Sequence, residues 1–110
     1  MPKRAERLAR NEALFREVNE RIAEVSSTWG TDRVAAVCEC ASEGCAETIE
    51  LAASEYEAVR AHGDRFVLRD GHEEPEIERV VERGERFIVV EKFGDGARVA
   101  RDLDPRSAES

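Results

Sequence analysis

Three cysteines within eight residues of one another could together bind a metal ion: Cys38, Cys40 and Cys45. Residues two apart in an extended strand point to the same side, so Cys38 and Cys40 can direct both sulfurs to one point. Gly44 permits a tight turn that would bring Cys45 back to that point. Three thiolates around one divalent ion match a tetrahedral zinc site that lacks one ligand.

The fourth ligand has to come from another part of the chain, and three sources are open. His72 lies in a predicted turn, Gly71-His72-Glu73, where a side chain projects well. His62 lies at the predicted end of a helix, where the helix dipole favours a cation, so a solvent-exposed role accounts for it more simply. Water or a carboxylate could also complete the site. We favour His72 and predict one zinc ion, although thiolates also suit iron or copper.

Two simpler interpretations compete with this one. A free cysteine is often only a small buried apolar residue. For three cysteines so close together in a cytoplasmic chain, however, the count favours metal binding. An acidic run follows His72 and could orient its imidazole, but such runs are more often solvated surface: Glu73, Glu74, Glu76 and Glu78.

The composition predicts one small acidic domain in the cytoplasm. The 110 residues carry a net charge of -8, whereas nucleic-acid-binding proteins usually carry a basic patch, so we expect no nucleic-acid partner. No apolar run approaches the length of a membrane helix, and the charged N-terminus lacks the apolar core of a signal peptide. We expect no disulfide framework, because cytoplasmic thiols stay reduced and because an odd number of cysteines would leave one of them unpaired.

Residues 5–25 are predicted to form an amphipathic helix. Its apolar residues recur at spacings of seven, three, four and three, which is typical of one helix face: Leu8, Phe15, Val18, Ile22 and Val25, with Leu14 beside them. We expect this face to pack on a sheet of the same chain. The alternative is that it pairs with a protein partner or with a second copy of the chain.

The remaining sequence predicts strands and one short helix. Strands are expected over 34–40, 48–51, 66–69, 77–82 and 86–93, and the last is apolar on both faces, as central strands are. Ser54 and Glu57 have the spacing of a capping box, and predict a helix to about His62 that stops at a left-handed Gly63. Trp29 is expected to cap the core.

Together these elements indicate the α+β class. We expect a small antiparallel sheet, an N-terminal helix, a second short helix, and a zinc knuckle between two strands. Residues 1–110 would form a single domain, with the helix at 5–25, a zinc-stapled core at 34–93, and a flexible, exposed tail at 94–110.

The chain resembles a group of small uncharacterised proteins that are common in actinobacteria. The likeness runs over residues 8–106 and rests on motifs that occur in the same order: Asn11–Ile22, Cys38-Glu39-Cys40 with Cys45, Glu55–Arg60, Gly71-His72-Glu73 and Val89–Lys92. The resemblance implies that Cys38, Cys40, Cys45 and His72 belong to one recurring pattern. The chain departs from the group around His62, and the group offers no established activity.

Three functions remain open from the sequence. The first is a non-enzymatic interaction or regulatory module with a structural zinc site, because no phosphate loop or oxyanion hole is recognisable. The second is a redox or metal sensor, since oxidised thiolates release zinc. The third is an enzyme in which water occupies the fourth zinc position.

Overall fold

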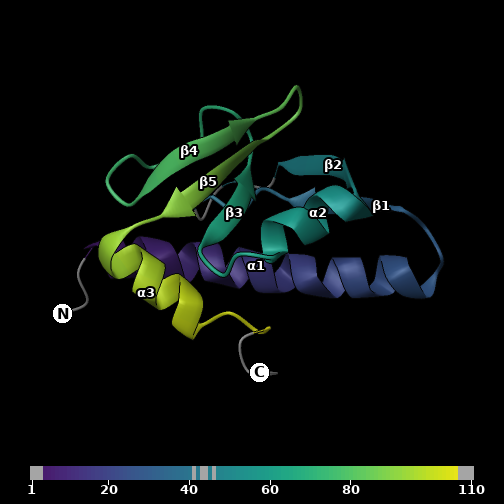
Figure 1. The fold of residues 1–110 in the computed structure, drawn as a ribbon, viewed down its shortest axis with the longest axis horizontal. Helices are drawn as coiled ribbons and strands as arrows, with labels where there is room; N and C mark the ends of the chain where they lie inside the picture. The colour runs from purple at the N-terminus through teal and green to yellow at the C-terminus, as the bar shows by residue number, and fades with distance from the viewer. Residues whose placement is uncertain (1–3, 41, 43–44, 46, 107–110) are drawn as a thin grey trace.

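The computed structural model describes residues 4–106, apart from 41, 43, 44 and 46. Figure 1 shows the first helix along one edge of the molecule, with all the strands on the same side of it. The mixed α+β class is confirmed. The elements, in chain order, are α1 Arg4–Thr28, β1 Arg33–Val37, β2 Thr48–Ala52, α2 Ala53–Arg60, β3 Arg65–Leu68, β4 Glu78–Arg83, β5 Ile88–Lys92 and α3 Gly94–Asp102.

The strands form two antiparallel sheets. β1 pairs with β2, from Arg33 opposite Ala52 to Val37 opposite Thr48. The other sheet has the order β3-β5-β4, so the strand that is apolar on both faces is the central one, as predicted. β4 contains a register shift between Val80 and Glu82.

One continuous cluster of buried residues joins the two sheets and α2. Branched and aromatic side chains dominate it, as the alternation in the strands predicts. The two-stranded and the three-stranded sheet therefore share the same core. Its large members include Val34, Ile49, Leu51, Tyr56, Phe66, Leu68 and Ile88.

The prediction for the face of α1 was wrong in part. Leu8 is buried, but Val18 and Val25 are 41% and 56% exposed, and Leu14 is 60% exposed. The buried face instead carries Glu12 and Arg16, together with Asn19, Ala9 and Ala13. Periodicity locates an apolar stripe on a helix, but it does not say that the stripe faces the core of the same chain.

The polar residues on the inner face of α1 are buried because each meets a complementary group. Arg16 donates to the carbonyl oxygens of Gly63 and Ala100, both at 2.7 Å, and its guanidinium lies 4.6 Å from the centre of the Phe66 ring. Glu12 pairs with Lys92 of β5. Buried polar groups are tolerated when paired in this way, and they allow only one position of the helix on the core.

Two further details of the prediction were wrong. Trp29 does not cap the core, since it is 82% exposed. α2 begins at Ala53 instead of after Ser54, because Glu55 accepts a hydrogen bond from the backbone N–H of Ala52 at 2.7 Å and satisfies the helix start.

Gly63 is not left-handed, and it lies beyond the end of α2 at Arg60. An added Cβ at this glycine would lie 2.9 Å from a carboxylate oxygen of Asp104. A close approach to the C-terminal segment, and not a helix stop, therefore accounts for the glycine.

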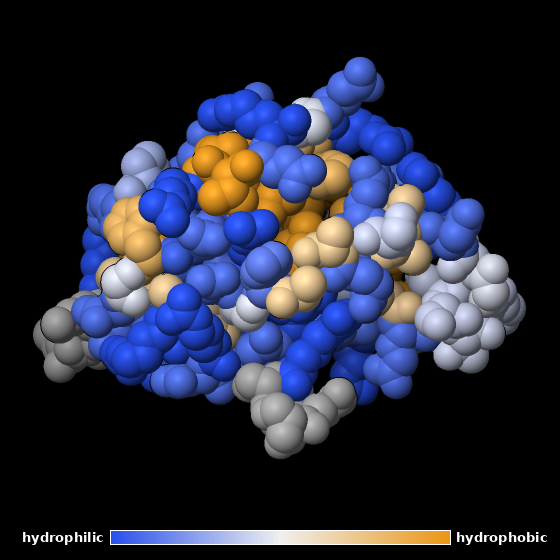
Figure 2. Space-filling model, viewed as in Figure 1, coloured by the Kyte–Doolittle hydropathy of each residue, from blue (hydrophilic) through white to orange (hydrophobic). Residues whose placement is uncertain are grey.

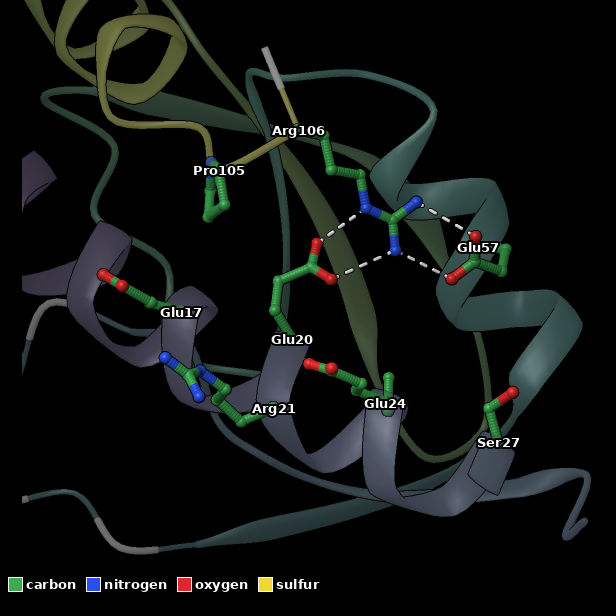
Figure 3. Close-up of a pocket in the computed structure, with 9 residues that line it drawn as sticks. Glu17, Glu20, Arg21, Glu24, Ser27, Glu57, Pro105 and Arg106 are labelled. Atoms are coloured by element: carbon green, nitrogen blue, oxygen red, sulfur yellow. Dashed lines mark hydrogen bonds and ion pairs between the residues drawn. The ribbon is translucent and has the colours of Figure 1, made fainter. Parts of the chain in front are cut away.

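The expected flexible tail was wrong for 94–106. Gly94–Asp102 form α3, which buries Ala97, Val99 and Ala100. Beyond it, Arg106 lies between Glu20 of α1 and Glu57 of α2, and Figure 3 shows its guanidinium bonded to both carboxylates. Helical spacing of three small apolar residues was the missed signal. Residues 107–110 lie outside the described part of the chain.

The surface is mostly hydrophilic. Figure 2 shows one face, on which an apolar patch lies over the β3-β5-β4 sheet. No helix in the described part of the chain is both long and apolar enough to cross a membrane.

Candidate metal centre

Cys38 and Cys40 lie on the extended segment that continues β1. The backbone N–H of Cys38 donates to the carbonyl of Glu47 at 2.9 Å, which prolongs the pairing with the partner strand. Alternation then places the two cysteines on one side of the segment and Glu39 on the other. Both cysteines are buried, with 1% of their surface exposed.

Glu39 anchors this segment from the opposite side. Its backbone N–H donates to Val67 of β3 at 3.0 Å, and its carboxylate accepts from the backbone N–H of Val67 and the amide of Asn19. Burial raises the pKa of Glu39 to about 7, although the bonds from Asn19 and Val67 act against it. Sequence reasoning missed this role, because a glutamate between two cysteines gives no sign that it is buried.

Cys45 lies close to Cys38 and Cys40. Its backbone N–H donates to the carbonyl of Ser42 at 3.2 Å, and the residue is half-buried. Gly44, which was predicted to allow a tight turn before Cys45, lies outside the described residues.

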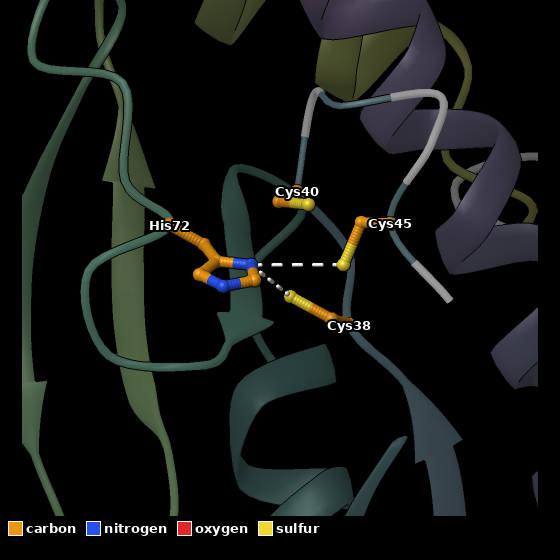
Figure 4. A group of neighbouring side chains, drawn as sticks. All are labelled: Cys38, Cys40, Cys45 and His72. Carbon is orange, nitrogen blue, oxygen red and sulfur yellow. Dashed lines mark hydrogen bonds between the residues drawn. The ribbon is translucent and has the colours of Figure 1, made fainter. Parts of the chain in front are cut away.

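His72 reaches the sulfurs from the loop between β3 and β4. Its backbone N–H donates to the carbonyl of Arg69 at 3.1 Å, which closes a turn. Gly71 occupies that turn with a φ of 91°, a conformation that glycine adopts without a steric penalty. The predicted turn is therefore present, and Figure 4 shows its imidazole facing the three cysteines.

The four candidate ligands come together in one group. One ligating atom from each of them, the three sulfurs and an imidazole nitrogen, lies within 4.8 Å of the others. Nδ1 of His72 is 3.5 Å from the sulfur of Cys38 and 3.6 Å from that of Cys45. A tetrahedral ion with ordinary zinc–sulfur and zinc–nitrogen bond lengths would separate such atoms by about 3.6 Å. The donor set and its spacing therefore fit a metal ion.

Without a bound cation, the surroundings of the site keep its buried thiols protonated. Burial raises the pKa of the thiols of Cys38 and Cys40, and the neighbouring thiols raise the pKa of Cys38 further. The backbone N–H of Arg69 opposes this, because it donates to the sulfur of Cys38 at 3.3 Å. Thiols in such surroundings ionise when a metal replaces their protons, as metal-bound cysteines do.

Glu47 orients the imidazole of His72. Its carboxylate lies 2.8 Å from Nε2, the ring nitrogen that points away from the sulfurs. Metal-bound histidines usually hold their second ring nitrogen in this way, which fixes the tautomer and the ring orientation. The acidic run after His72, for which a solvated surface was the favoured interpretation, does not supply this carboxylate. Its actual position, just before β2, follows from the pairing of Glu47 with Cys38 and not from nearness in sequence.

The acidic run itself is only partly solvated. Glu78 is buried and pairs with Lys92, while Glu76 is exposed and binds Arg4. His62, the alternative ligand, does not belong to the group of four. It lines a separate cavity with Phe87 and Val89.

The candidate metal centre borders an open cavity of about 460 Å³. Cys45 and His72 line this cavity, together with Cys40 and the acidic side chains of Glu47, Glu73 and Glu74. A small solute could therefore approach the half-buried side of the site, whereas Cys38 is covered by protein.

Comparison with protein-family models, with curated proteins and with solved structures gave no match. The feature of this chain that points to a function is therefore the geometry of the group of Cys38, Cys40, Cys45 and His72.

Proposed function

We propose that this chain is a small zinc protein, in which Cys38, Cys40, Cys45 and His72 hold one structural zinc ion. The observation that carries the proposal is the approach of His72 to the three sulfurs, within 4.8 Å for all four atoms. Four protein ligands would complete a tetrahedral shell and leave no position for a reacting water. The same count argues against an enzyme with an open zinc position.

The placement of the ligands supports a structural role. Three of them follow β1 of the two-stranded sheet, and the fourth follows β3 of the three-stranded sheet. An ion bound to all four would therefore tie the two sheets together at the surface. Small domains gain stability from such a link because their cores are limited.

The test is metal analysis of protein purified without added zinc. We expect one zinc ion per chain in the wild type, measured by native mass spectrometry and elemental analysis. His72→Ala should retain much less zinc, because it removes a ligand.

His62→Ala is the matched control, since its imidazole is exposed and lies outside the group. The proposal is overturned if the wild type binds no zinc, even when refolded with it, or if His62→Ala lowers the zinc content and His72→Ala does not. A full content of iron or copper would keep the site but change the metal.

We infer an interaction or regulatory role in the cytoplasm, because the group of four ligands in the described part of the chain is suited to holding an ion and not to a reaction. A thiol-based sensor is the second candidate, and one observation favours it. Cys45 is only half-buried and lines the open cavity, so an oxidant could reach its sulfur. Zinc release under mild peroxide, with the zinc of a buried-site protein retained in the same tube, would support the sensor.

A further inference from the structure

The outer face of α1 carries an apolar stripe that no part of the described chain covers. Leu14, Val18 and Val25 are 60%, 41% and 56% exposed. Trp29 extends the stripe at 82% exposed, because its backbone N–H still bonds to Val25 in helical fashion. We name these four residues the α1 stripe.

The stripe lies opposite the face that docks α1 on the protein. At 100° per residue, its members fall within an arc of about 60°, on the far side from Glu12, Arg16 and Asn19. Those three are fully buried. Figure 1 shows both sheets on one side of α1 and α3 against its N-terminal half. The four stripe residues face neither the sheets nor α3, since each of them is exposed.

Charges beside the stripe change sign along the helix. Arg7 and Arg10 lie toward the N-terminal end, and both are exposed. Glu17, Arg21 and Glu24 lie toward the C-terminal end and are also exposed. The two ends of this surface therefore carry opposite charge, which favours a partner helix that runs the other way.

We propose that the α1 stripe is the interface of an antiparallel homodimer, in which α1 packs on α1 of a second copy about a two-fold axis near residues 19 and 20. In that arrangement Leu14 meets Val25 of the other copy, and Glu17 meets its Arg21. Arg10 lies against the Trp29 ring of the other copy, where its guanidinium can stack on the aromatic face. Each contact occurs twice, because a two-fold interface is self-complementary.

A parallel pair is disfavoured by the same charges. It would place Arg21 opposite Arg21 beside the stripe, and Arg7 opposite Arg7 at its end. Like charges in a helix seam reduce the stability of the pair, whereas the antiparallel pair brings Glu17 to Arg21. The charges beside the stripe therefore favour a second copy of the chain as the partner, and they favour the antiparallel direction for its α1.

The first experiment is sedimentation equilibrium of the full-length protein from low micromolar to near-millimolar concentration. We expect a monomer–dimer equilibrium, accompanied by a blue shift of Trp29 fluorescence as the dimer forms. Val25→Glu should weaken dimerisation at least about tenfold, because it places a charge in the interface twice. Val81→Glu is the matched control, since Val81 is 39% exposed but lies on β4.

The second experiment tests the direction of pairing by exchanging charges. Glu17→Arg and Arg21→Glu should each weaken the dimer, and the double variant should restore it, because it rebuilds the pair with the signs reversed. Thermal unfolding at a concentration where all variants are monomeric checks that each one folds.

Several outcomes would overturn the proposal: a monomer at every concentration, a dimer indifferent to Val25→Glu, or a double variant as weak as the single ones. The zinc content of each variant is measured in parallel. The stripe does not include a metal ligand, so failure of the dimer leaves the zinc proposal intact, and the reverse also holds.

Discussion

Two glutamates determine how the candidate ligands are presented, although neither is a ligand itself. Glu39 fastens the Cys38–Cys40 segment to β3 and α1 from behind, and Glu47 holds the far nitrogen of His72 at 2.8 Å. Ligands held in advance lose less conformational entropy when the ion binds. The affinity for metal should therefore depend on both.

Glu47→Ala is expected to lower zinc affinity by about tenfold to hundredfold, because the imidazole of His72 loses the partner that fixes its tautomer. Competition with a chromogenic chelator measures the change. Glu47→Gln should recover part of the affinity, since an amide oxygen can still accept from Nε2. Glu50→Ala is the matched control, because Glu50 lies in β2, three residues from Glu47, but pairs with Arg33. Equal loss in both alanine variants would contradict the assigned role of Glu47.

Among the single residues, the candidate ligands were the best predicted. The spacing of the cysteines and the turn at Gly71 were sufficient to nominate the group that the structure brings together. Glu47 and Glu39 could not be nominated in the same way. Their roles depend on the pairing of β2 with the segment after β1 and on the contact with Val67, and both are long-range.

At the scale of elements, the C-terminal segment is fastened to the protein by charge. Asp104 is nearly buried and pairs with Arg60 of α2, and it also accepts from the backbone N–H of Arg106 at 3.0 Å. Burial acts to raise the pKa of Asp104, but the bonds from Arg60 and Arg106 and the charge of Arg16 hold it below its usual 3.8. The ionised form is therefore the one that stabilises the fold.

Asp104→Asn is expected to lower the free energy of unfolding by about 2 kcal/mol at neutral pH, because it leaves Arg60 with an incomplete set of charged partners. A lowered pKa means that the stabilisation is complete above pH 3.8 and is lost as the pH falls further. The difference between wild type and variant should therefore shrink below that pH. Urea denaturation at several pH values measures it.

Asp102→Asn is the control for this prediction. Asp102 is exposed and only approaches Arg98 at 3.9 Å, so its removal should change the free energy of unfolding by less than about 0.5 kcal/mol. Metal loss at low pH affects all three proteins alike and cancels in the comparison. A difference that stays constant down to pH 2 would contradict the assigned pair.

The helices and strands themselves were largely predictable, whereas their packing was not. The apolar residues on both faces of 86–93 were sufficient to place β5 at the centre of its sheet. The orientation of α1 was not predictable, because its buried face is polar and is satisfied by Lys92, Gly63 and Val37, which are distant in sequence. Apolar periodicity therefore combined residues that contact the core, Leu8 and Ile22, with residues of the outer face such as Val18 and Val25.

At the scale of the whole molecule, the candidate metal site spans the boundary between the two sheets. Its ligands follow β1 and β3, while the shared core lies beneath. An ion that binds only the folded chain stabilises it according to its concentration relative to its dissociation constant. Removal of the metal should therefore lower the stability of the entire fold and not only that of the loop that carries His72.

Chelation of the metal is expected to lower the unfolding midpoint by about 15 °C or more, if free zinc exceeds its dissociation constant about a thousandfold. Thermal unfolding followed by circular dichroism, with and without EDTA, measures the shift. Cys45→Ser should already unfold at the lower temperature and should hardly respond to EDTA. A wild-type midpoint that does not change with EDTA would contradict a structural role for the metal.

The sequence by itself determined the local features of this protein: the helical and strand periods, the turn at Gly71, and a cysteine spacing suited to one ion. These depend on residues near one another in the chain, so pattern alone reports them. Only the tertiary structure decided which face of α1 is buried, that Arg106 binds Glu20 of α1, and that Glu47 supports His72. Each of these depends on partners far along the chain, whose nearness exists only once the two sheets and α1 have packed.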